Sequence, residues 1–144
     1  MIDKRKFYIN GTWVDPIVKN DLEVINPSNE QSYAVISLGS KKEVDLAVNA
    51  AKKALVTWSQ INKEEKINLL EKLLKIYKSR WNEITQTMSE EMGAPLDWSS
   101  SAQTSSGADH INDFILRLKN FEFEKRFNKN SNNYIVYEPI GVCG

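Results

Sequence analysis

One long amphipathic segment, residues 63–91, constrains the fold of this chain more than any other feature. Asn62 followed by Glu65 is a helix start signal, and Gly93 and Pro95 stop the helix at its other end. Between these signals the apolar residues alternate three and four positions apart, at Ile67, Leu70, Leu74, Tyr77, Trp81, Ile84 and Met88. This spacing places them on one face of a helix. The sequence therefore predicts a single long helix whose apolar face packs against other elements.

A coiled-coil seam is the alternative for this segment, because the spacing persists for about three heptads. Leu69, Leu73 and Ile76 widen the apolar stripe beyond the two positions in seven that a seam uses. Packing inside a globular domain is therefore the favoured interpretation.

Length and composition bound the class of protein. A length of 144 residues favours one domain, and a compact chain of this size could bury roughly two thirds of its unfolded surface. The 19 basic and 19 acidic residues balance and are interspersed, so no net field favours nucleic acid or an anionic membrane. One cysteine and one histidine exclude an internal disulfide and a Cys/His zinc site. Without a signal peptide or a membrane span, we expect a soluble, cytoplasmic protein.

Two β-hairpins are predicted at the start of the chain. In FYINGTWV, residues 7–14, Asn10-Gly11 separates two short runs of aromatic and β-branched residues, which indicates a tight hairpin turn. Residues 22–37 form a second hairpin that turns at Asn26-Pro27-Ser28-Asn29, since proline disfavours helix in the residue before it and Asn and Ser favour turns.

Two further helices are predicted. Ser40 and Glu43 form a capping box for a helix over residues 41–57, whose apolar face consists of Val44, Ala47, Val48, Ala51, Leu55 and Trp58. A helix over residues 98–122 starts weakly, because its Ser/Thr-rich half competes for backbone hydrogen bonds. A polar turn at residues 128–133 and a strand that starts at Asn133 follow this helix.

Few residues in the chain carry chemistry. Cys143 is the candidate nucleophile, but nothing local lowers a thiol pKa, and its place in a predicted apolar strand favours a small hydrophobic role. His110 is the single histidine, and a surface or partly buried helix position is the favoured interpretation. The segment from Gly141 to Gly144 lacks the G-x-G-x-x-G order, and no helix follows it. Taken alone, these residues support no reaction.

The adjacent carboxylates Glu90 and Glu91 lie at the C-terminal end of the long predicted helix. The helix dipole disfavours negative charge there, so their position is compatible with a compensating cation, although a plain solvated helix end is the more common case and the favoured interpretation.

The order of several segments is more specific than any one of them. FYINGTWV is followed by VINPSNEQSYAVISLGSKKEVDLAVNAAKKAL and Trp58, then by the long helix ending in EEMGAPL, a further helix, and YEPIGVCG. In this order, and over nearly the whole chain, they resemble the N-terminal portion of the NAD(P)-dependent aldehyde dehydrogenase superfamily. The resemblance implies an α/β fold of β-hairpins and helices, with a bridging strand that leads into a truncated dinucleotide-binding domain. It also implies a division into residues 1–128, the hairpin and helical part, and residues 129–144, the bridging strand and the start of a Rossmann-like core.

The same resemblance implies a function for the longer parent. Members oxidise an aldehyde to a carboxylic acid with NAD or NADP, through a thiohemiacetal on a cysteine, and form homo-oligomers in which the segment over residues 133–140 pairs between subunits. Their oxyanion asparagine follows EPIGV within a Pro-Trp-Asn motif, and their cofactor contacts, glutamate base and nucleophile lie further on. The resemblance therefore places no catalytic or cofactor-binding residue within this chain, and Cys143 is not the nucleophile. The chain alone is expected to be an inactive fragment.

One site is carried over by the resemblance. Family members hold a structural Na⁺ or K⁺ by backbone carbonyls before the Asn-Pro turn and by an acidic side chain near the end of the long helix. The matching positions are Val24, Ile25 and Glu91, which offer hard oxygen ligands. The alternative to an enzyme fragment is a free-standing structural or interaction module that binds a full-length homologue or another partner.

Overall fold

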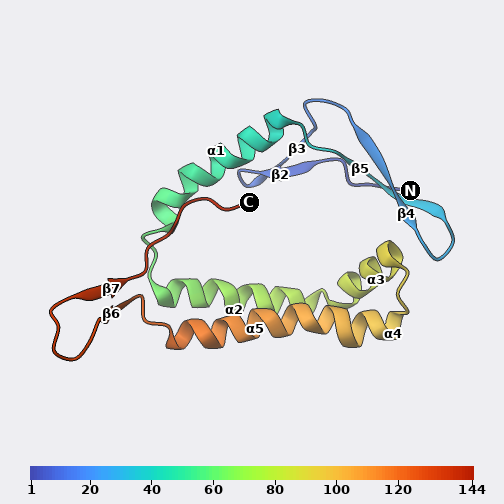
Figure 1. Cartoon of the computed structure of the whole chain (residues 1–144). Coiled ribbons are helices and arrows are strands. Elements are labelled where there is room, and N and C mark those ends of the chain that lie inside the picture. Colours follow the sequence, from blue (N-terminus) through green and yellow to red (C-terminus); the bar gives the residue numbers. More distant parts are fainter.

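The first predicted hairpin is present in the computed structural model, which describes all 144 residues (Figure 1). Strands β2 (Phe7–Ile9) and β3 (Thr12–Val14) pair in antiparallel fashion. Asn10 and Gly11 between them have φ angles of 52° and 80°, which is the left-handed conformation that a two-residue hairpin turn requires. The prediction from the Asn-Gly pair is confirmed.

The second predicted hairpin is also present and belongs to a three-stranded sheet. Strands β4 (Asp21–Asn26) and β5 (Gln31–Ser37) are antiparallel, and β1 (Ile2–Asp3) pairs with β5 in parallel, in the order β1-β5-β4. Sequence reasoning missed β1, because a two-residue strand is too short to show alternation. A β-bulge between Val24 and Ile25 shifts the β4–β5 register.

Helix α1 (Lys41–Trp58) begins at the predicted capping box. The Ser40 side chain accepts a hydrogen bond from the Lys42 amide at 3.2 Å, while the Glu43 carboxylate accepts one from the Ser40 amide at 2.8 Å. Glu43 is buried and also accepts from the Ile17 amide at 2.6 Å. Hydrogen bonds from the Ser40 side chain and the Ile17 amide lower the pKa of Glu43 to about 2. One carboxylate thus caps α1 and ties it to the segment after β3.

The long predicted helix is interrupted. It consists of α2 (Lys63–Ser79) and α3 (Trp81–Met92), separated at Arg80, whose φ of −103° and ψ of 18° are not helical. The prediction of one continuous helix is therefore wrong at this residue. A break of a single residue leaves the three-and-four spacing intact, so apolar periodicity cannot detect it. In Figure 1, α3 leaves the line of α2 at this point.

The third predicted helix is present and consists of three consecutive helical segments. It comprises α4 (Leu96–Trp98), a six-residue π-helix η1 (Ser99–Thr104) and α5 (Ser105–Asn120). The serine hydroxyls of the η1 region donate to carbonyls four residues back, from Ser101 to Asp97 at 2.6 Å and from Ser106 to Ala102 at 2.6 Å. The side-chain competition expected from the Ser/Thr-rich run therefore appears as a local change of helix type.

Helix α5 lies along α2 (Figure 1) and contributes three of the five buried apolar residues, Ala108, Ile115 and Leu118. The two helices approach closely at Gly107. A Cβ atom there would lie 2.3 Å from the Tyr77 hydroxyl, so a larger residue would require the Tyr77 side chain to move.

The C-terminal region contains a small hairpin. Strand β6 (Glu124–Arg126), which sequence reasoning missed, pairs with β7 (Tyr134–Val136). Residues 138–144 form no strand, and the Ile140 side chain is 95% exposed. The prediction that Cys143 lies in an apolar strand is therefore wrong for this structure, because an extended segment becomes a strand only where another segment pairs with its backbone.

The buried core is small. Only 11 of the 144 residues are buried, and the accessible surface is 11093 Å². A compact chain of this mass exposes about 7,500 Å² of the ~24,000 Å² that it exposes when unfolded. The chain therefore buries about half of its unfolded surface, which is less than the two thirds that a compact chain of this size could bury. Figure 1 shows α1 and the N-terminal sheets set apart from the α2–α5 pair. None of the helices is both long and apolar enough to cross a bilayer.

Candidate functional site

The predicted cation site lies where the end of β4 meets the end of α3. The Asn26 side chain is buried, and its Nδ2 donates to Glu90 Oε2 at 2.5 Å. Its Oδ1 accepts from the Ser28 amide at 2.8 Å, which fixes the turn after β4. Gly93 ends α3 with a φ of 73°, and a Cβ atom on it would lie 2.8 Å from Pro27 Cγ. The strand end and the helix end are therefore in direct contact.

Two of the three predicted ligand positions, Val24 and Ile25, lie in β4, and the third, Glu91, lies in the last turn of α3. Val24 and Ile25 flank the β-bulge, where ladder hydrogen bonding is disrupted. Glu91 is exposed and directly follows Glu90, which bonds to Asn26. No group of three or more His, Cys, Asp or Glu side chains that could hold a metal ion is present.

Glu90 is a residue whose role sequence reasoning missed. The charge argument singled out Glu90 and Glu91 together, but only Glu90 accepts hydrogen bonds from side chains, from Asn26 at 2.5 Å and from Gln86 at 2.9 Å. These two neutral amides offset its charge at the helix end. The Asn26-Pro27 pair indicated the turn, and it gave no information about a partner 64 positions away.

The structure provides no nucleophilic site around Cys143. The thiol is free and exposed, and its one hydrogen-bond partner is the Gly141 carbonyl at 3.9 Å. An acceptor carbonyl does not stabilise a thiolate, which needs a cation, a base or a helix N-terminus. His110 is exposed on α5.

An open cavity of about 830 Å³ lies beside the N-terminal segment, and its lining is mostly charged. Its charges are largely paired, since Arg5 contacts Asp3 at 2.6 Å and Asp21 at 3.2 Å, and Lys6 contacts Asp15 at 3.4 Å. Hydrogen bonds from Arg5 lower the pKa of Asp3 to about 2. Neither Cys143 nor His110 lines this cavity, so it brings no thiol or imidazole to a bound aldehyde.

A buried polar cluster joins η1 to α2 and α3, and sequence reasoning missed it as well. Thr85 and Thr104 share a hydrogen bond of 2.9 Å between their Oγ1 atoms, and the Tyr77 hydroxyl donates to the Thr104 carbonyl at 3.0 Å. Trp81 Nε1 donates to Ser100 Oγ at 2.9 Å. The hydroxyl of Ser99, which is fully buried, has no partner. The cluster orients α3 against η1. It contains no carboxylate, histidine or thiol that could carry a reaction.

Comparison with known proteins identifies the family that this chain resembles. The Aldehyde dehydrogenase family profile matches residues 13–144. A 3-succinoylsemialdehyde-pyridine dehydrogenase from a Pseudomonas species is 39% identical over the whole chain, and a putative aldehyde dehydrogenase from Staphylococcus aureus (strain bovine RF122 / ET3-1) is 37% identical. The chain spans 30% of the length of each of these relatives.

Solved structures agree with the sequence relatives. An aldehyde dehydrogenase from Bartonella henselae superposes with a TM-score of 0.90 at 47% identity, covering 92% of this chain and 28% of that one. An aldehyde dehydrogenase C variant from Pseudomonas syringae, solved with NAD⁺ and octanal, superposes with a TM-score of 0.84 at 30% identity, covering 86% of this chain and 26% of that one. The hairpins, the helices and their order therefore recur in these enzymes. The chain belongs to the aldehyde dehydrogenase family and corresponds to its N-terminal portion.

Proposed function

We propose that the chain is the N-terminal portion of an enzyme that oxidises an aldehyde to a carboxylic acid with NAD or NADP. The observation that carries this proposal is the match of residues 13–144 to the family together with the 0.90 TM-score to a family structure. In the proposed enzyme a cysteine thiolate attacks the aldehyde, the thiohemiacetal loses hydride to the nicotinamide, and water hydrolyses the thioester. The nucleophile, the base and the oxyanion asparagine are not among residues 1–144, whose role is structural.

The free-standing module is not the favoured reading. The whole chain aligns with relatives that carry the complete family fold, and no part of it is left for an unrelated interaction domain.

A direct test is the activity of the purified 144-residue chain. We expect no aldehyde-dependent formation of NADH or NADPH, because the Cys143 thiol is exposed and its one hydrogen-bond partner is the Gly141 carbonyl, with no neighbouring base to activate it as a nucleophile. Reproducible turnover that Cys143→Ser abolishes would contradict this expectation, and turnover that survives Cys143→Ser would indicate a contaminating enzyme.

The proposed cation site consists of the Val24 and Ile25 carbonyls and the Glu91 carboxylate, which hold Na⁺ or K⁺ and support the β4–α3 contact. The β-bulge and the Asn26–Glu90 bond support this assignment, because they bring the two element ends together. We expect Na⁺ or K⁺ to raise the melting temperature relative to choline at equal ionic strength, and Glu91→Gln to abolish the difference. Glu122→Gln, which replaces an exposed carboxylate remote in sequence from β4 and α3, is the control. An unchanged cation dependence in Glu91→Gln would exclude the site.

The remaining features of the proposed enzyme follow the family. Residues 1–128 supply the hairpin and helical part of the cofactor-binding domain, and residues 129–144 supply the bridging strand and the start of the Rossmann-like core.

Strand β7 is bonded only to β6, so its other edge is free to pair with a second subunit, which supports a homo-oligomer. The single free thiol supports a reducing, cytoplasmic setting.

A further inference from the structure

The turn of the β2–β3 hairpin holds the only Asn-Gly pair in the chain, and the pair is open to solvent. Asn10 and Gly11 are both exposed, and a Cβ atom built on Gly11 would meet no atom within 4 Å. The one side-chain hydrogen bond of the turn runs from Thr12 Oγ1 to the Ile9 carbonyl, at 3.2 Å. The Asn10 side chain and the Gly11 amide are therefore left without a hydrogen-bond partner.

An unbonded asparagine side chain beside an unbonded glycine amide can react with it. Glycine has no Cβ, so nothing hinders the approach of the Gly11 nitrogen to the Asn10 side chain. Once hydroxide has taken the amide proton, the nitrogen attacks the Cγ atom of Asn10. The N–Cγ bond forms, the bond from Cγ to Nδ2 breaks, and ammonia leaves with a proton taken from water. The product is a cyclic succinimide.

Water then opens the succinimide in either of two ways. Addition at Cγ breaks the bond to the Gly11 nitrogen and leaves an ordinary aspartyl residue at position 10. Addition at the backbone carbonyl carbon breaks its bond to the Gly11 nitrogen instead, and leaves an isoaspartyl residue whose side-chain carbon carries the main chain. Both products place a carboxylate where Asn10 has a neutral amide, and the isoaspartyl product also lengthens the backbone by one methylene group.

The fold around the turn offers little resistance to this reaction. Strands β2 and β3 form a sheet of their own that no third strand joins. An isolated two-stranded hairpin is marginally stable in water, so its turn opens readily. Asn10 also lines a cavity of about 370 Å³ between the hairpin and α1. The charged residues of that cavity are Asp15, Glu43 and Lys53, and none of them is bonded to Asn10 or Gly11.

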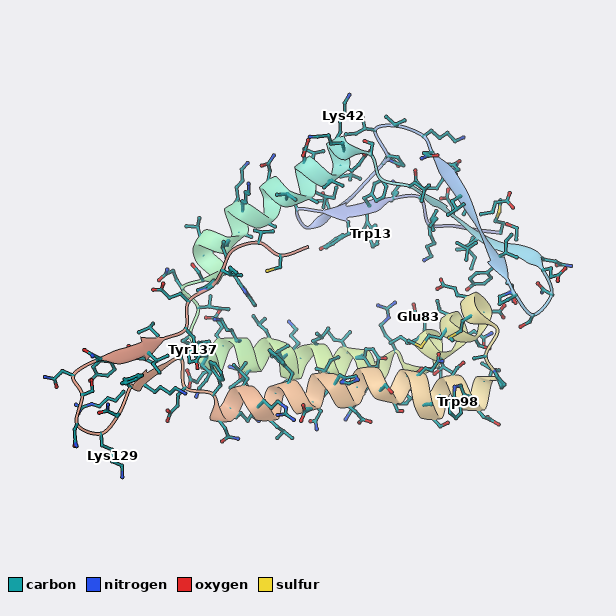
Figure 2. The ribbon with its side chains drawn as sticks, in the orientation of Figure 1. Trp13, Lys42, Glu83, Trp98, Lys129 and Tyr137 are labelled. Atoms are coloured by element: carbon teal, nitrogen blue, oxygen red, sulfur yellow. The ribbon has the colours of Figure 1, made fainter.

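The loop that joins β6 to β7 provides an internal contrast. Asn130 is exposed and precedes a small residue, Ser131, and Figure 2 shows Lys129 of this loop pointing away from the rest of the molecule. The Ser131 amide, however, donates to the Asn128 carbonyl at 3.2 Å. A bonded amide must lose its hydrogen bond before its nitrogen can attack a side chain. The fold therefore restrains this asparagine and leaves Asn10 unrestrained.

We infer that Asn10 is a site of spontaneous deamidation in the folded chain, with water as the co-reactant and an aspartyl or isoaspartyl residue as the product. The reaction needs neither a cofactor nor an aldehyde, so it goes beyond the proposed function and does not depend on it. The isoaspartyl product inserts an extra methylene group into a two-residue turn, which disrupts the pairing of Ile9 with Thr12.

Ageing of the purified 144-residue chain at mildly alkaline pH tests this inference, in buffer and in concentrated guanidinium chloride. Peptide mass spectrometry follows the replacement of the side-chain amide by a carboxylate at Asn10 and at Asn130. An isoaspartate-specific methyltransferase labels the isoaspartyl product. Asn10→Gln is the control for this label, because its longer side chain does not close the same ring.

We expect Asn10 to deamidate in buffer within about twofold of its rate in denaturant, because opening of the turn costs little free energy. Asn130 should react roughly fivefold more slowly in buffer than in denaturant, because the Ser131 amide must first lose its hydrogen bond. The methyltransferase should label position 10 of the aged chain and not of Asn10→Gln. The rate at Asn10 should also rise with pH, because its amide neighbour must lose a proton.

The comparison of the two asparagines decides the outcome. If buffer protects Asn10 as strongly as Asn130, the fold shields the Asn-Gly pair and the inference is overturned. If neither asparagine is protected in buffer, the fold makes no selection between them and the inference is overturned as well. Isoaspartyl labelling of Asn10→Gln equal to that of the unaltered chain would assign the modification to another residue and would also overturn it.

Discussion

Two buried hydroxyl groups in η1 differ in how they are satisfied. The Thr104 hydroxyl is bonded to Thr85 at 2.9 Å, whereas the Ser99 hydroxyl has no partner, and both residues are fully buried. Burying a hydroxyl without a hydrogen bond costs about 1–3 kcal/mol. The two residues therefore have opposite expected effects on stability.

We predict that Ser99→Ala raises the free energy of unfolding by about 1 kcal/mol, because it removes an unpaired buried hydroxyl. Thr104→Val should lower the free energy of unfolding by about 1–3 kcal/mol, because it leaves the Thr85 hydroxyl unpaired. Urea denaturation of both variants measures the two changes. A loss of stability in Ser99→Ala would show that its hydroxyl has a partner, such as a buried water.

Residue roles were predictable from the sequence where they depend on near neighbours. The Asn10-Gly11 turn and the capping box of Ser40 and Glu43 each depend on residues within a few positions, and both are present. The bonds from Asn26 to Glu90 and from Thr85 to Thr104 connect residues 64 and 19 positions apart. No local pattern encodes such pairs, so they were missed.

At the scale of elements, the start of α1 depends on one carboxylate. Glu43 is buried, with its pKa lowered to about 2 from the ordinary value of 4.5 by hydrogen bonds from Ser40 and Ile17. A carboxylate whose pKa is lowered by folding contributes stability above its unfolded pKa, and this contribution is lost as the pH falls toward the folded pKa.

We therefore predict that the melting temperature falls as the pH is lowered from about 5 toward about 2, in part because Glu43 becomes protonated. Glu43→Gln should lower the melting temperature near neutral pH and reduce its dependence on acid, as followed by circular dichroism. Glu64→Gln, at an exposed position in the first turn of α2, should keep the acid dependence of the unaltered chain. If Glu43→Gln and the unaltered chain show the same acid profile, Glu43 does not carry this dependence.

The elements themselves were largely readable from the sequence. Both N-terminal hairpins, α1 and the helical segments that end in α5 were predicted from periodicity and caps. The break at Arg80 was not, because apolar spacing continues from α2 into α3. Strands β1 and β6 were missed because they are short and are recognisable as strands only through their pairing with β5 and β7.

At the scale of the whole molecule, the open arrangement has a measurable consequence. The denaturant dependence of the unfolding free energy scales with the surface exposed on unfolding. Because folding leaves 11093 Å² exposed, the chain exposes roughly a fifth less new surface on unfolding than a compact chain of its mass.

We predict a urea m-value roughly a fifth below that of a compact 144-residue domain. An m-value equal to that of a compact domain would show that the chain closes up in solution.

The sequence by itself determined the family, the two hairpins, the caps and the apolar faces of the helices, because these depend on residue types at short spacing. Only the tertiary structure decided where those faces lie. It showed that α2 is covered by α5, that Leu46 and Ala50 of α1 line a cavity beside the β2–β3 hairpin, and that the β4 end meets the α3 end through Asn26 and Glu90. The reason is physical: an apolar stripe encodes the need for a covering partner, whereas which segment covers it depends on contacts between residues that are distant in sequence.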